Sequence, residues 1–293
     1  MQDNVCVQSV LLSSPLFPAC LKDLSNPPGQ LFWRGDFNID ALEAPYRIAI
    51  VGTRKVSAHG ENLAFSIAHD LARAGVVIIS GLALGVDGVA HRGALAGDGI
   101  TWAVLPCGIK RVYPSQHESI AQEILSKKGC LFSEYPADAP AFPGQFVSRN
   151  RIIAALANAV VIVEAPTHSG ALHTARAASQ LGRKLFVVPG PVGGGMYDGS
   201  FSLIRSGATL VTSASDIMHD LSLSFDAPKS PLSKNSQNPI LQALATSPHP
   251  LSLDMLSQIT TLSPHVLSAK LSGFIVEGLV SEDTAGRYFL KNK

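Results

Sequence analysis

The sequence predicts an α/β fold built on a doubly wound, mostly parallel sheet, followed by a small C-terminal winged-helix domain. From Tyr46, short continuous apolar runs alternate with segments whose apolar residues recur at helical spacing. Unbroken apolar runs are typical of strands that are buried on both faces, as in parallel sheets. Six or more such repeats favour an extended Rossmann-like architecture, in which helices cover both faces of the sheet.

The expected elements follow one another along the middle of the chain. We expect Ser57 to cap the N-terminus of the first helix and Gly75 to close it. We expect strands at 47–51, 76–79, 101–105, 130–133, 159–163, 184–188 and 209–211. We expect helices near 63–74, 87–95, 120–125, 152–156, 170–181, 203–204 and 215–221.

Four regions are predicted. Residues 1–45 are rich in Pro, Ser and Asn, and read as an extended N-terminal arm that packs on the body, with a possible short strand at 31–33. Residues 46–221 form the Rossmann-like domain, and residues 222–238 form a linker. Residues 239–293 contain three helical patterns and a hairpin pattern, which suggest a winged helix. Within it, Ser252 is a possible cap of the second helix, and Ser263 and Pro264 start the third.

Bulk composition sets few limits on function. The chain has 293 residues, is 46% apolar and carries a net charge of +1, so any anion site must be local. Its four cysteines lack metal-type spacing and read as thiols in a reducing compartment. Because no signal peptide and no membrane-spanning run is evident, we expect a cytoplasmic protein without membrane contact. No residue pattern predicts a metal ion or a cofactor.

Three glycine- or hydroxyl-bearing loops follow predicted strands. Ligands of open α/β sheets bind beyond the carboxyl ends of strands, where glycines let backbone amides approach a phosphate. Sharp turns also need glycine, so each loop alone is weak evidence. Together with nearby cations, the loops predict a phosphate-binding surface. Its candidate residues are Gly52, Thr53, Arg54 and Lys55 in the first loop, Ser80 and Gly81 in the second, and Ser169 and Gly170 in the third.

Two arginines stand close to the start of another predicted helix. Arg149 and Arg151 precede the apolar run 152–156, with no acidic residue within four positions on either side. Because a helix N-terminus is itself positive, this crowding makes sense if an external anion binds there, with Asn150 between the two arginines. Phe146 could stack on a base beside them, although Phe142 is an equally placed candidate.

Familiar enzyme signatures are missing. The first loop lacks the G-x-G-x-x-G pattern of dinucleotide sites, and no phosphate-binding P-loop occurs. Asp87 and His91 lie four apart, but Asp87 is expected to cap a helix. The five-residue spacing of His168 and His173 does not suit two ligands on one helical face, and Glu164 is assigned a structural or orienting role.

The ordered motifs of the middle region resemble the DprA (Smf) family of DNA-processing proteins. They are 50–54 (IVGTR), 80–83 (SGLA), 85–87 (GVD), 90–95 (AHRGAL), 111–114 (RVYP), 133–136 (SEYP), 149–154 (RNRIIA) and 169–175 (SGALHTA). The resemblance is strong over 46–220 and weaker on either side. It implies an extended Rossmann fold, a homodimer, and binding of single-stranded DNA that enters during natural transformation, which the protein protects while helping to load the RecA recombinase. It also implies that Gly52, Thr53, Arg54, Ser80, Gly81, Arg149, Asn150, Arg151, Ser169 and Gly170 bind phosphate.

The chain departs from the family pattern in three places. Leu84 stands where a basic residue is often found, and Phe201 stands where Asn is usual. The family's common helical N-terminal domain is also expected to be absent, because about forty-five residues precede the sheet.

Two other functions remain open. The loops also resemble those of nucleotide phosphoribohydrolases of the lysine-decarboxylase-like fold, but 170–175 offers none of the carboxylates that such enzymes need. A protein-interaction scaffold with vestigial sites is the third possibility. We expect a binding protein, not an enzyme.

Overall fold

The computed structural model describes residues 7–37, 42, 46–223, 238–247, 250–276, 279–283 and 286–290. The chain divides into two compact units, Met1–Asp226 and Ala227–Lys293. Most of the predicted linker, and residues 1–6, 38–41 and 43–45 of the predicted arm, lie outside the described residues.

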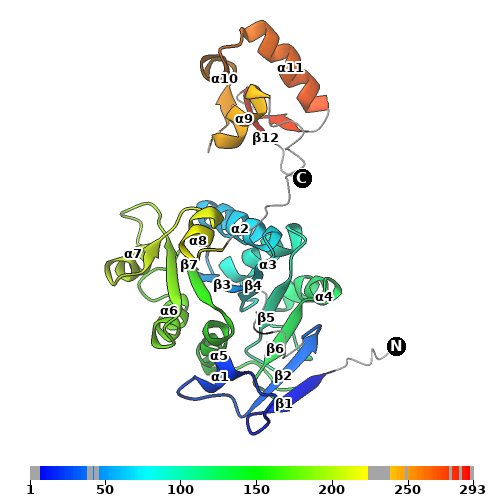
Figure 1. Ribbon diagram of the computed structural model, residues 1–293, viewed down its shortest axis with the longest axis vertical. Coiled ribbons are helices and arrows are strands. Elements are labelled where there is room, and N and C mark those ends of the chain that lie inside the picture. The colour runs from blue at the N-terminus through cyan, green and yellow to red at the C-terminus, as the bar shows by residue number, and fades with distance from the viewer. Residues whose placement is uncertain are drawn as a thin grey trace. The chain divides into compact units, whose positions relative to one another are not determined.

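The described part of the first unit is built on a nine-stranded sheet (Figure 1). Its strand order is β1-β2-β6-β5-β4-β3-β7-β8-β9, and the seven strands from β6 to β9 in this order pair in parallel. The order runs outward from β3 in both directions, so the sheet is doubly wound as the sequence predicts. The strands are β1 (Gln8–Leu11), β2 (Gln30–Gly35), β3 (Arg47–Gly52), β4 (Val77–Ser80), β5 (Thr101–Val104), β6 (Cys130–Ser133), β7 (Ala159–Val163), β8 (Lys184–Val188) and β9 (Thr209–Leu210).

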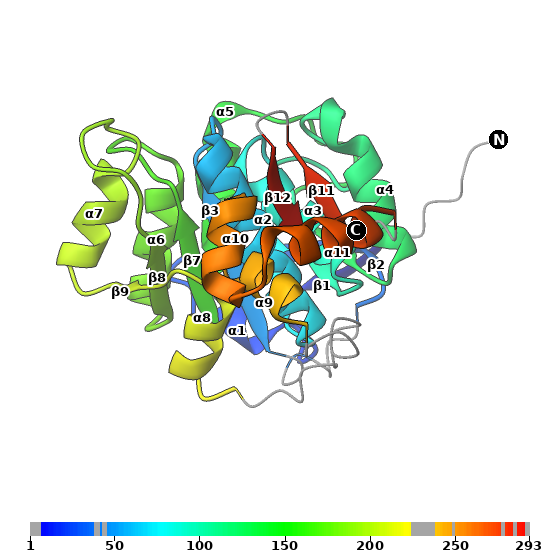
Figure 2. The same cartoon turned by 90° about the horizontal axis from the view of Figure 1, so that it is seen from above.

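Helices cover both faces of this sheet. Alternate residues of β3 point to opposite sides: Ile48 and Ile50 join one apolar core, whereas Ala49 and Val51 join the other. Helices α2 (Ala58–Arg73), α3 (Val86–Ala96) and α8 (Ala214–Asp220) pack on the first side, and α4 (Glu118–Ser126) packs beside α3. Helices α1 (Ala19–Lys22), α5 (Pro143–Leu156) and α6 (Ala171–Gln180) pack on the second side, and α7 (Asp198–Arg205) follows β8 (Figure 2).

The N-terminal segment extends the sheet. Strand β2 pairs antiparallel with β6, with Phe32 opposite Ser133, and β1 pairs with β2. The ring of Phe37 makes edge contacts with Trp33, Trp102 and Phe132, at centroid distances of 4.8–5.5 Å. The predicted strand at 31–33 is therefore present. The segment belongs to the first unit and contributes β1 and β2 to its sheet.

The described part of the second unit contains three helices and a three-stranded antiparallel sheet of order β10-β12-β11. Its elements are α9 (Pro239–Thr246), β10 (Leu251–Ser252), α10 (Leu253–Thr260), α11 (Pro264–Val276), β11 (Val280–Glu282) and β12 (Arg287–Leu290). Ser252 accepts a hydrogen bond from the amide of Met255, so it caps α10 as predicted, and α11 begins at Pro264. This combination of elements suits a winged helix, which remains our interpretation of the unit.

Candidate functional site

A pocket of about 300 Å³ opens at the carboxyl ends of β3 and β7. These neighbouring strands mark the point where the strand order reverses, which is where open α/β sheets bind ligands. Its walls come from the loops after β3, β4 and β7, from α5 and from the start of α6. Predicted site residues that line it are Gly52, Thr53, Arg54, Phe146, Arg149, Asn150, Ser169 and Gly170; those that do not are Lys55, Ser80, Gly81 and Arg151.

The loop after β3 is held by backbone contacts that leave its cations in solvent. The amide of Thr53 donates to the carbonyl of Glu164, and the amide of Lys55 donates to the hydroxyl of Thr53. Thr53 is buried, whereas Arg54 and Lys55 are exposed. Ser57 then accepts a hydrogen bond from the amide of Gly60 and caps α2, as predicted. The loop thus presents two positive side chains from a fixed backbone.

Arg54 and Phe146 meet at the wall of the pocket. The guanidinium carbon of Arg54 lies 4.8 Å from the centre of the Phe146 ring, a cation–π arrangement. Tyr113 contacts the same ring edge-on at 5.3 Å. Phe146 is half-buried and lines the pocket, whereas Phe142 is 58% exposed at the cap position of α5 and does not line it. The structure therefore separates the two phenylalanines that the sequence left equivalent.

Arg149 is buried inside the helix, not placed at its start. Helix α5 begins at Pro143, so the prediction that Arg149 and Arg151 crowd a helix N-terminus is wrong. The first helical turns, 143–148, carry few apolar residues, and the periodicity of the sequence revealed only the apolar second half. Arg149 is 3% exposed, and its guanidinium donates to the carbonyls of Gly81 and Val104. Burial lowers the pKa of Arg149 to about 10, although the nearby Asp87 carboxyl acts in the opposite direction.

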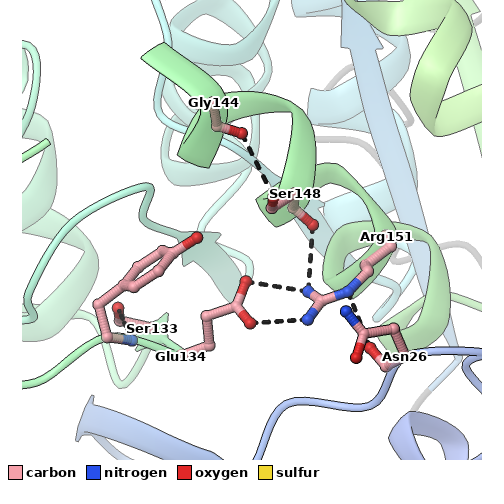
Figure 3. A network of polar contacts seen from close by, with 7 residues as sticks. Asn26, Ser133, Glu134, Gly144, Ser148 and Arg151 are labelled. Carbon is pink, nitrogen blue, oxygen red and sulfur yellow. Dashed lines mark hydrogen bonds and ion pairs between the residues drawn. The ribbon is translucent and has the colours of Figure 1, made fainter. Parts of the chain in front are cut away.

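Arg151 is occupied by protein acceptors outside the pocket (Figure 3). Its two terminal nitrogens lie 2.9 and 2.6 Å from the carboxylate oxygens of Glu134. It also donates to the carbonyls of Asn26 and Ser148, at 3.0 and 3.1 Å. Glu134 lies 17 positions before Arg151, so the sequence next to the arginine does not reveal this counterion. The paired arginine ties α5 to the N-terminal segment and to the loop after β6.

The start of α6 offers open backbone at the pocket. Asn150 donates to the carbonyl of Gly170 at 3.1 Å, and the Ser169 hydroxyl accepts from the amide of Ala171 at 3.3 Å. Gly170 is exposed, and a Cβ built on it would meet no atom within 4 Å. A ligand can therefore come close to the positive end of this ten-residue helix.

Two predicted residues lie beside the pocket without lining it. The Ser80 hydroxyl donates to the carbonyl of Ile50 at 2.7 Å and is fully buried. The amide of Gly81 donates to the Asp87 carboxyl at 3.1 Å. A Cβ on Gly81 would lie 2.4 Å from the Arg149 guanidinium, so glycine is required here for packing. Both residues therefore stabilise the protein around the pocket.

Asp87 and His168 also line the pocket, which the sequence did not reveal. Asp87 lies within the first turn of α3, after a cap position occupied by Gly85. Burial raises the pKa of the Asp87 carboxyl, and the Arg149 guanidinium opposes that shift. From the sequence, Asp87 was considered as a helix cap and His168 as a metal ligand. Neither role indicates that the side chain lines a pocket.

His91 and Glu164 are buried close to these loops. The ring of His91 contacts the Thr101 hydroxyl at 2.7 Å, and burial lowers its pKa to about 3. Glu164 accepts hydrogen bonds from Ser57, in keeping with the orienting role predicted for it. Among the residues that the structure describes, no group of three or more acidic, cysteine or histidine side chains could hold a metal ion. The described helices include none long and apolar enough to cross a membrane.

Known proteins resemble this chain over most of its length. It is 40% identical to the protein Smf of Escherichia coli over 220 residues, which cover 74% of this chain and 58% of that protein. It is 44% identical over 191 residues to a putative DNA processing protein DprA of Mycobacterium tuberculosis, covering 65% of this chain and 49% of that protein. The chain thus spans about half of the length of these relatives.

A solved structure shares the fold of this chain over most of its length. It is that of DNA processing protein A from Helicobacter pylori, with a TM-score of 0.67 and 30% identity, covering 77% of this chain and 100% of that one. That protein is described as having a unique single-stranded DNA binding mode. The model of the family described as DNA recombination-mediator protein A matches residues 8–222. With this match over most of its length, the chain belongs to the DNA recombination-mediator protein A family, which also contains the DprA and Smf proteins.

Proposed function

We propose that the chain binds single-stranded DNA at the pocket formed by the loops after β3 and β7. The observation that carries this proposal is the placement of Arg54. Its guanidinium is exposed and lies against the Phe146 ring at the pocket wall, close to the open start of α6. A phosphate needs cations and free amides, and a base needs an aromatic or apolar surface. The pocket places the exposed Arg54 cation and the Phe146 ring within one hollow, beside the N-terminal end of α6.

The structure refines the set of residues proposed to contact DNA. We keep Gly52, Thr53, Arg54, Phe146, Asn150, Ser169 and Gly170 as pocket residues, and Lys55 as a neighbouring exposed cation. We assign Arg149, Arg151, Ser80 and Gly81 to holding the pocket in shape, because their polar groups are bound within the protein. Direct phosphate contact then depends mainly on Arg54.

We further propose that the protein protects single-stranded DNA and helps to load the RecA recombinase on it, as a homodimer in the cytoplasm. Support for a role in DNA recombination comes from membership of the recombination-mediator family, and support for single-stranded DNA binding comes from the description of the Helicobacter pylori relative. The chain spans about half of the curated relatives' length, so the activity of the whole protein is part of the proposal. The C-terminal unit is proposed not to be the main DNA reader. Helix α11 carries one lysine and one histidine, too few donors for a recognition helix.

We propose that the protein acts by binding and not by catalysis. The alternative is hydrolysis of the glycosidic bond of a nucleotide. Asp87 gives this alternative some support, because it is a carboxyl group on the pocket wall with a raised pKa. However, its oxygen accepts the amide of Gly81, and no second carboxyl group is found among the described residues lining the pocket. Glycosidases of the common types need a pair of carboxylates.

Two parallel measurements separate these functions. Fluorescence anisotropy with a labelled single-stranded oligonucleotide and with the matching duplex should show tighter binding to the single strand and little sequence preference. Incubation with nucleoside monophosphates should release no free base. Equal affinity for the two DNA forms contradicts the proposed function, and release of base supports the enzymatic alternative.

A further inference from the structure

Glu164 contacts both ends of the segment that carries Arg54. Its backbone carbonyl accepts the amide of Thr53 at 2.9 Å. Its carboxylate accepts the amide of Ser57 at 3.1 and 3.2 Å, and the Ser57 hydroxyl at 2.7 Å. One residue after β7 therefore fixes the positions on either side of Arg54 and Lys55.

The surroundings of Glu164 show that its carboxylate is built into the fold. The side chain is fully buried, and the Tyr197 hydroxyl lies 3.4 Å from the same oxygen that Ser57 contacts. A Cβ on Gly60 would lie 2.1 Å from that oxygen, so the first turn of α2 packs directly against it. Hydroxyl and amide donors thus converge on the Glu164 carboxylate. An ionised carboxylate has acceptor oxygens and no donor, so it suits this set of partners.

The backbone of Glu164 is in a conformation that side chains rarely adopt. Its φ is 56°, in the left-handed region, where glycine is at ease and glutamate is strained. This conformation lets a single residue offer its carbonyl to Thr53 and its carboxylate to Ser57. Glycine would remove the strain, but it would lose every contact with Ser57.

We propose that Glu164 is a positioning residue for DNA binding, which holds Thr53 and Ser57 so that Arg54 stays aligned with Phe146. The inference rests on the proposed binding of single-stranded DNA at this pocket. Glu164 touches no DNA in this account; it acts through the loop. The competing explanation is that Glu164 serves only the stability of α2, because Ser57 also caps that helix by accepting the Gly60 amide at 3.1 Å.

A double-mutant cycle distinguishes positioning from helix stability. Affinity for a labelled oligothymidylate is measured at low salt for the full chain, Glu164→Ala, Arg54→Ala and the double variant. Glu164→Ala should weaken binding by roughly tenfold on its own but by less than about twofold when Arg54 is already absent, since coupled residues are not additive. Glu164→Gln keeps one acceptor oxygen and should recover part of the lost affinity.

Asp216 provides a matched control outside the pocket. Its carboxylate accepts the amides of Thr212 and Ser213 and the Thr212 hydroxyl at 2.7–3.0 Å, and Ser213 caps α8. Asp216→Ala should lower the melting temperature without changing DNA affinity. If Glu164→Ala does not fold, Ser57→Ala enters the same cycle, because it removes the hydroxyl that donates to Glu164.

The outcomes are distinct. Full affinity of a folded Glu164→Ala, while Arg54→Ala weakens binding, overturns the positioning role and leaves the proposed function intact. An equal loss of DNA affinity from Glu164→Ala with and without Arg54 also overturns the positioning role. Where Ser57→Ala replaces Glu164→Ala in the cycle, an equal loss from Ser57→Ala overturns it in the same way. A wild-type protein that does not bind the oligothymidylate overturns the proposed function itself.

Discussion

Arg54 lies over the ring of Phe146, with 4.8 Å between its guanidinium carbon and the ring centre. The contact joins the loop after β3 to helix α5, which are distant in the sequence. It also leaves the cation exposed, since its partner is an uncharged ring and not a carboxylate. Arg54 therefore differs from Arg149 and Arg151, whose donors are bound within the protein.

The Arg149→Ala substitution should destabilise the fold. The change removes the donor for the carbonyls of Gly81 and Val104, and each buried carbonyl left unsatisfied costs roughly 1–3 kcal/mol. It also removes the positive charge that opposes the raised pKa of the buried Asp87 carboxyl. Thermal unfolding should show a clearly lower melting temperature. A variant that melts like the wild type and binds DNA weakly would restore the simpler assignment of Arg149 as a phosphate ligand.

Phe146→Ala should weaken DNA binding more than Phe142→Ala does. Phe146 lines the pocket and supports Arg54, and loss of an aromatic platform costs about 1–3 kcal/mol of binding. Phe142 is exposed outside the pocket, so its truncation should cost less than about 0.5 kcal/mol. Anisotropy titrations of both variants, with unfolding curves as a check, decide the order. A larger loss for Phe142→Ala would move the base contact to the start of α5.

Gly170→Ala should reduce DNA affinity without loss of stability. A methyl group there meets no protein atom within 4 Å, but it occupies space at the start of α6 where we propose that a phosphate approaches. We expect roughly tenfold weaker binding. Gly144→Ala is the matched control, because Gly144 is equally open but does not line the pocket. If both variants bind like the wild type, the phosphate does not approach the start of α6.

His91 should make the fold less stable in mild acid. Its pKa is about 3 in the folded chain, lowered first by burial and then by the positive charges of His117, Arg149 and Arg92. The ordinary value is about 6.5, so below that pH the unfolded chain takes up a proton that the folded chain refuses. The stability that depends on a neutral His91 is fully present above pH 6.5. Between pH 6.5 and pH 3, the free energy of unfolding falls by up to about 1.4 kcal/mol per pH unit.

The pH dependence is checked by comparing the wild type with His91→Asn. Melting temperatures are recorded for both proteins between pH 8 and pH 5. The wild type should lose more stability than the variant below pH 6.5, because the asparagine side chain does not titrate. Parallel curves for the two proteins would show that acid acts through other groups.

The pattern of the sequence was sufficient to predict the α/β architecture, but it did not predict the roles of individual arginines. Continuous apolar runs located β6, β7 and β8 at the residues where the structure has them. The rule that ligands bind at strand ends placed all three loops at the pocket, although Ser80 and Gly81 of the second loop do not line it. Both inferences depend on local patterns, which one sequence contains in full.

Contacts between segments that are distant along the chain could not be predicted from the sequence. The pairing of Arg151 with Glu134, the carbonyls that hold Arg149 and the Glu164–Ser57 bonds all join loops that only the folded sheet brings together. The start of α5 was missed because its first turns lack an apolar stripe. A cation seen in the sequence can bind a ligand or a carbonyl, and its burial in the fold decides which.

The salt dependence of DNA binding by Arg54→Ala tests the central claim most directly. For single strands, each neutralised phosphate contributes roughly 0.7 to the slope of log affinity against log salt concentration. For Arg54→Ala, the account predicts a slope shallower by about 0.7 and a binding free energy weaker by about 1–3 kcal/mol. The melting temperature should not change. Arg205→Ala, which removes an exposed cation at the end of α7, should bind like the wild type. An Arg54→Ala protein with the wild-type slope and affinity would contradict the account.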